Sequence, residues 1–129
     1  MSSRILDIPP DEWGGFFDEL TREHRNAIVT IDVNASEIED RIHVQDVPLE
    51  GIALLLNGNE EVISIIVRKG AREHTMHSIH DPHRVRYEKA GGMATRLQVE
   101  SENGETTIVT FRSMSVPDTV QAQTMSDPA

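Results

Sequence analysis

The strongest constraint on the fold is a change in the spacing of apolar residues at Asn26. Before it, four apolar residues have the spacing i, i+3, i+4 and i+7 of one helix face: Trp13, Phe16, Phe17 and Leu20. After it, apolar and polar residues alternate, as in the run "AIVTIDV" at 27–33. A period of two is typical of strands with one buried face. The chain therefore begins with one helix and continues as strands.

Further runs with strand character follow along the chain, at 41–47, 51–56, 61–67, 74–79, 84–89, 94–101 and 106–112. The runs 51–56 and 61–67 are apolar almost throughout, as expected of strands covered on both faces, so we assign both faces to the core. Asn-Gly turns at 57–58 and 103–104 are hairpin signals. Short turns without intervening helices predict antiparallel neighbours.

The apolar stripe of the helix must pack on an apolar surface, and the strands provide it. We therefore expect an α+β domain: one N-terminal amphipathic helix packed on an antiparallel β-meander of about eight strands, forming a curled sheet or a partly closed barrel. The domain is expected to span 8–113, with 1–7 and 114–129 as flexible termini.

Gly14 and Gly15 are unfavourable inside the helix, each by about 1 kcal/mol relative to Ala. Two interpretations are open. The glycines either admit another backbone at close range, or they are tolerated because tertiary packing overrides local propensity.

The composition narrows the functional classes. The 129 residues include no cysteine and carry a formal charge of −10. A disulfide scaffold, a thiolate zinc site and a cysteine nucleophile are excluded. The acidity argues against nucleic-acid and anionic-membrane partners. The start of the chain lacks a secretory-signal pattern, and the apolar runs are too short to span a bilayer, so we expect a cytoplasmic protein.

One segment, "REHTMHSIHDPHR" at 72–84, holds four of the six histidines at steps of three: His74, His77, His80 and His83. On a strand, His74 and His80 share a face but lie about 20 Å apart. Zinc–nitrogen bonds are only about 2.0–2.1 Å long, so these two cannot share an ion. The weak metal candidates that remain are His80 and His83, across the Asp81-Pro82 turn, and we predict no metal site.

Sequence motifs for catalysis are lacking. The chain has no G-x-S-x-G, H-E-x-x-H, P-loop or G-x-G-x-x-G pattern. We therefore predict no catalytic residue and no cofactor, and an enzyme is the less favoured class.

Several motifs occur in a characteristic order. They are "IPPDEWGGFFDELTREH", then "IVTIDV", "PLEGI" (48–52), "HSIHDPHRV" (77–85) and "LQVESENGETTIVTFRS" (97–113). Over about residues 8–117 this order resembles a family of small bacterial proteins known only as a domain of unknown function. The resemblance implies a stand-alone single domain, and it brings no catalytic residues. Of the four histidines, only His77 falls within the shared pattern.

The one basic stretch of the chain is 68–89, with six basic and three acidic residues. We therefore predict a non-enzymatic interaction module that binds a second copy or another protein. The candidate surface comprises Arg68, Arg72, His77, His83, Arg84 and Arg86. The alternative is a small-molecule or metal-binding protein that uses the histidine-rich segment 74–83. Protonation of these histidines below about pH 6 is a further interpretation, and a solvated sheet edge is the interpretation without function.

Overall fold

The computed structural model describes residues 3–35, 38–70, 72–90 and 93–112. Within them a 3-10 turn, Pro10–Glu12, leads into one α-helix, α1, Trp13–His24. The strands are β1 Ser3–Ile8, β2 Ile28–Ala35, β3 Ile38–Asn57, β4 Glu60–Arg68, β5 His74–His80, β6 Pro82–Ala90, β7 Met93–Ser101 and β8 Thr106–Phe111.

Helix α1 forms where the helical spacing predicts it. Its stripe is in the core, with Trp13, Phe17 and Leu20 buried. Phe16 is half-buried and meets the ring of Tyr87 edge-on, with ring centroids 4.9 Å apart. The helix ends before Asn26, whose φ of 73° is left-handed, as expected of an asparagine that closes a helix.

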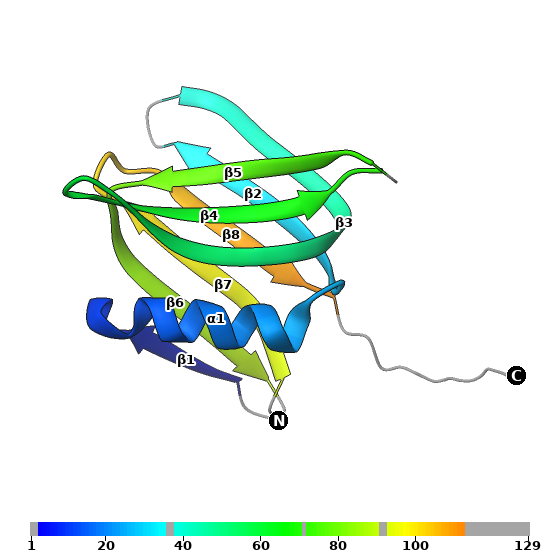
Figure 1. Cartoon of the computed structure of the whole chain (residues 1–129), viewed down its shortest axis with the longest axis horizontal. Coiled ribbons are helices and arrows are strands. Elements are labelled where there is room, and N and C mark those ends of the chain that lie inside the picture. Colours follow the sequence, from blue (N-terminus) through cyan, green and yellow to red (C-terminus); the bar gives the residue numbers. More distant parts are fainter. Residues whose placement is uncertain (1–2, 36–37, 71, 91–92, 113–129) are drawn as a thin grey trace, which may run out of the picture.

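The eight strands form one sheet in the order β1-β6-β7-β8-β2-β3-β4-β5. All neighbours are antiparallel. The sheet is curled and open, with β1 and β5 as its edges, and α1 packs against it (Figure 1). The predicted α+β class, with one helix on a curled antiparallel sheet, is confirmed.

Strand β3 joins two parts of this sheet. Its first part pairs with β2 up to Pro48, and its second part pairs with β4 from Leu49 onward. The register shifts on both sides of this point, and Asp46 has a φ of 56°. The two strands predicted at 41–47 and 51–56 are therefore one bent strand, because a bulged strand can turn without breaking.

Beyond the bend, β3 has lost β2 as a neighbour, and α1 lies along its free edge (Figure 1). The hydroxyl of Thr21 accepts a hydrogen bond from the Ile52 N–H at 2.9 Å and donates one to the Ile52 carbonyl at 3.0 Å. A Cβ added at Gly51 would lie 3.4 Å from Cγ2 of Thr21. The helix thus takes the place of a neighbouring strand.

The glycines inside α1 have no such neighbour. Apart from the adjacent residues and the helix's own backbone, no described atom lies within 4 Å of a Cβ placed at Gly14 or Gly15. The interpretation of close backbone approach is therefore wrong for these two positions. The close approach to the helix occurs at Gly51, on the strand.

Strand β1 corrects the predicted domain start. Residues 3–7, placed in a flexible terminus by the sequence, pair with β6, from Ser3 opposite Ala90 to Ile8 opposite Val85. The strand escaped the sequence analysis because Ile5 and Leu6 are adjacent and obscure the alternation. Leu6 packs against the core, whereas Ile5 is exposed. The predicted C-terminal terminus, 114–129, lies outside the described residues.

We expect Thr21→Val to lower the free energy of unfolding by about 1–3 kcal/mol, because it keeps the side-chain shape but leaves the Ile52 N–H and carbonyl without partners. Urea unfolding measures this. Thr21→Ser is the control, since it keeps the hydroxyl and should retain most of the stability. A valine variant as stable as the parent chain would contradict the role assigned to this contact.

Gly15→Ala should raise the free energy of unfolding by about 0.5–1 kcal/mol, because the added methyl meets no atom and alanine favours the helix. Gly58→Ala is the opposing control. Gly58 has a φ of 68°, so alanine there should lower stability by about 1–2 kcal/mol. Thermal or urea unfolding of both variants checks the two signs, and a destabilising Gly15→Ala would be inconsistent with the open space at this site.

Candidate functional site

The four histidines of segment 72–84 lie in different surroundings. His74 and His80 lie near opposite ends of β5, where Nδ1 of His74 is 3.1 Å from Oε1 of Glu50 and Nδ1 of His80 is 2.9 Å from Oε2 of Glu60. Strand β5 alternates as expected, so His77 lies on the other face, with Nε2 3.5 Å from the hydroxyl of Thr107. His83 is exposed at the start of β6.

The weak metal candidates His80 and His83 have separate neighbours. Asp81, with a φ of 51°, stands between them at the bend from β5 to β6. His80 contacts Glu60, whereas His83 lines a surface pocket of about 430 Å³ beside Glu100, Glu102 and Glu105. Among the described residues, no group of three His, Asp or Glu side chains could hold a metal ion.

The predicted basic surface is divided by the fold. Arg68 and Arg72 flank the β4–β5 connection, while Arg84 and Arg86 lie on β6, beyond the far end of β5. The seven residues of β5 separate the two pairs by about 20 Å. His77 faces the interior between them. The structure therefore brings together Arg84 with Arg86, and Arg68 with Arg72, but not all six residues.

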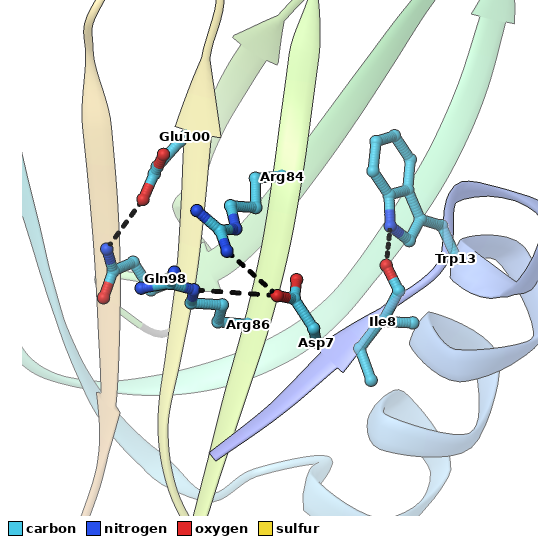
Figure 2. Close-up of polar contacts among 7 residues, drawn as sticks. All are labelled: Asp7, Ile8, Trp13, Arg84, Arg86, Gln98 and Glu100. Carbon is cyan, nitrogen blue, oxygen red and sulfur yellow. Dashed lines mark hydrogen bonds and ion pairs between the residues drawn. The ribbon is translucent and has the colours of Figure 1, made fainter.

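Asp7 of β1 pairs with both arginines of β6, Arg84 and Arg86. Its Oδ2 accepts a hydrogen bond from Arg84 at 3.1 Å and lies 4.0 Å from Nε of Arg86, as Figure 2 shows. The Arg84 hydrogen bond lowers the pKa of Asp7, and Asp7 raises the pKa of Arg84. These groups are solvated, so the pairs contribute little to stability. They join β1 to β6 and engage both Arg84 and Arg86 within the same chain.

The same region anchors the start of the helix. The indole N–H of Trp13 donates a hydrogen bond to the carbonyl of Ile8 at 2.8 Å (Figure 2). This contact ties the end of β1 to the first turn of α1. On the neighbouring strand β7, the Gln98 amide donates to Glu100 at 3.2 Å. The outer surface of β1, β6 and β7 thus carries internally paired polar side chains together with the exposed side chain of Ile5.

Several polar side chains lie together at one end of the interior, around His77. Thr107 is buried opposite it, and the hydroxyl of nearby Ser101 is buried without a hydrogen-bond partner among the described residues. Burial lowers the pKa of His77, and the negative charge of Glu105 opposes this shift. Thr107 was not predicted as a site residue, although the alternation of β8 places it on the same buried face as Val109.

The outer face of β3, β4 and β5 differs from that of β1 and β6. On this outer face, Leu55 of β3 and Met76 of β5 are 48% and 57% exposed. Leu56 is 74% exposed, but it shares the other face with Ile52 and Leu54, at the end of β3. The assignment of both faces of 51–56 to the core is therefore wrong, because no described element covers the outer side of this layer (Figure 1). On the same face, Ser64 is buried among its neighbours and its hydroxyl has no partner among the described residues.

The two sheet edges also differ. The edge strand β1 carries exposed charges at Arg4 and Asp7. The edge strand β5, "HTMHSIH", has no Lys, Arg, Asp, Glu or Pro. Charged residues and proline are the usual protection of an edge against pairing with another chain. Strand β5 is therefore the less protected edge.

A groove runs between α1 and the second part of β3, with a volume of about 540 Å³. We call it the α1–β3 groove. Its helix wall includes Asp18, Arg22 and Arg25, and its floor includes Gly51, Ala53 and Ile66. The hydroxyl of Thr21 also lines it but is already bonded to Ile52. The groove thus combines charged walls with a floor of small and apolar residues.

Comparison with known proteins supports a family but no activity. A family model described as "Family of unknown function (DUF5335)" matches residues 4–120. A protein of Aquifex aeolicus (strain VF5), described as an uncharacterized protein, is 28% identical over 97 residues, which is 75% of this chain and 82% of that protein. No solved structure gives a significant match. In the described part of the chain, no helix is long and apolar enough to cross a membrane.

The burial of His77 predicts that the free energy of unfolding depends on pH. Its pKa in the folded state lies below the ordinary 6.5, so the unfolded chain binds more protons between the two values. Stability is therefore fully present above pH 6.5 and is lost as pH falls through the lowered pKa. His77→Leu should flatten the free energy of unfolding between about pH 7 and pH 5. His80→Gln controls for the loss of an exposed histidine, and an unchanged slope in His77→Leu would contradict this.

Proposed function

The chain belongs to the family of unknown function DUF5335, and we propose that it is a cytoplasmic protein-interaction module that self-associates through strand β5. The observation that carries the proposal is the character of this edge. Its seven residues are free of formal charge in a chain of net charge −10. Repulsion between two copies is therefore weakest where β5 meets β5.

Two copies of an edge strand pair most simply around a two-fold axis. An antiparallel pairing centred on His77 places His74 of one copy opposite His80 of the second. The backbone groups of both edges are then satisfied, and the sheet continues across the interface. The exposed side chain of Met76 is brought toward that of the second copy on the same outer face.

The charges around β5 favour this direction of pairing. Lys69 and Arg72 lie near its beginning. Glu60 and Glu61 lie near its end, directly before Val62, which pairs with His80. A two-fold antiparallel arrangement sets the basic end of each copy beside the acidic end of the other. Opposite charges across a rim mainly govern association rate and register.

This proposal keeps part of the surface predicted from the sequence. Arg68 and Arg72 belong to the basic end of β5. Arg84 and Arg86 are excluded, because Asp7 occupies them within the same copy. His77 is at the centre of the strand but faces its own interior, so its part is to position β5 and not to contact the second copy.

We expect a dimer at low salt in sedimentation velocity, weakened in about 0.5 M salt because rim charges are screened. Met76→Lys should produce a monomer, since it places two cations near the two-fold axis. Ile5→Lys is the matched control, as Ile5 is 67% exposed on the other edge and should leave the dimer intact. A monomer at every salt concentration would rule the proposal out.

The register has a sharper test. Lys69→Glu with Arg72→Glu should weaken the dimer, and adding Glu60→Lys with Glu61→Lys should restore it, because the two ends exchange sign together. Sedimentation equilibrium of the three forms measures the effect. Weakening without rescue would mean that these ends do not face each other.

A further inference from the structure

We propose that residues 116–120 of this chain, "VPDTV", bind in the α1–β3 groove, with the carboxylate of Asp118 between Arg22 and Arg25. The proposal is independent of self-association through β5. It assigns to the groove an occupant from the same polypeptide.

The groove is lined by two acidic residues, Asp18 and Glu50, and by two basic residues, Arg22 and Arg25. Arg22 lies in the last turn of α1 and Arg25 directly follows the helix. Both are exposed, and neither has an ion-pair partner among the described residues. The other acidic residue on the strand side, Glu50, is already engaged by Arg68 at 3.4 Å and by His74 at 3.1 Å. A carboxylate can accept hydrogen bonds from one guanidinium in a bidentate manner and contact the second.

The floor of the groove is suited to binding apolar side chains. Gly51 and Ala53 keep it open, and Ile66 is only partly buried beneath it. A volume of about 540 Å³ is within the ordinary range of about 300–1,000 Å³ for sites that hold a small ligand. The groove therefore fits a short segment in which apolar residues flank one acidic group.

The chain supplies such a segment next to the groove. The last described residue, Arg112, donates its N–H to the carbonyl of Ile28 at 2.9 Å. Ile28 follows the helix end directly, three residues after Arg25. An extended chain advances about 3.3–3.6 Å per residue, so Val116 can lie about 13 Å from Arg112. That reach brings 116–120 to the groove without strain on the fold.

The composition of the segment matches the groove. Val116, Pro117 and Val120 flank Asp118. Residues 113–129 include a second acid, Asp127, and no Lys, Arg or His. The match to the family model runs to residue 120, so 116–120 fall within the sequence pattern of the family although they follow the last strand.

The full chain tests this directly, because it has no cysteine and a single one can be introduced. A nitroxide attached at Thr119→Cys should broaden the amide NMR signals of Gly51 and Ala53, while the signal of Ile5, on the far edge, should remain. If the amide signals of Gly51 and Ala53 both keep their full intensity, the proposal is wrong. The nitroxide-labelled chain is also mixed at equal amounts with an isotope-labelled chain lacking the nitroxide. Broadening of Gly51 and Ala53 in this nitroxide-free chain would show a contact between copies and would also overturn the proposal.

Variants identify the contact. Arg22→Glu with Arg25→Glu should restore the signals of Gly51 and Ala53, whereas Arg4→Glu with Arg96→Glu, an equal charge change on β1 and β7, should not. Asp118→Lys should also restore them. Broadening that persists in Asp118→Lys and in the double arginine variant would contradict the proposed contact.

Discussion

The structure depends on how the free edge of β3 is covered once this strand has bent away from β2. A strand that leaves its neighbour exposes backbone N–H and carbonyl groups, which must find partners if they are to be buried. Helix α1 provides them through Thr21, which bonds both groups of Ile52. The same helix buries Trp13, Phe17 and Leu20 in the core. One helix thus covers both the core and the free edge of β3.

This arrangement leaves the edges and faces of the molecule unequal. The edge at β1 is charged, paired through Asp7 to β6 and tied to the helix by Trp13. The edge at β5 is uncharged and lies beside exposed apolar residues of the same layer. In a chain of net charge −10, the edge strand β5 itself has no residue with a formal charge.

The sequence predicted the helix, most strands and the splayed histidines, because these follow from local periods of 3.6 and 2. It did not predict β1, where adjacent Ile5 and Leu6 hide the alternation. It split β3 in two, because Pro48 and Gly51 resemble a turn when their pairing partners are unknown. It assigned Leu55 to the core, since an apolar run does not tell which face is covered. The contact of His77 with Thr107 joins strands distant in sequence, so no local pattern encodes it.

Amide hydrogen exchange at Ile52 tests the central claim most directly, because this N–H has no strand partner on its side and is held only by the Thr21 hydroxyl. The account predicts protection close to that of Ile63 and Ile65 in the neighbouring strand, with opening only when the domain unfolds. Exchange at Ile52 as fast as that of exposed Asn59 in the β3–β4 turn would contradict it, and would mean that the helix does not close this edge.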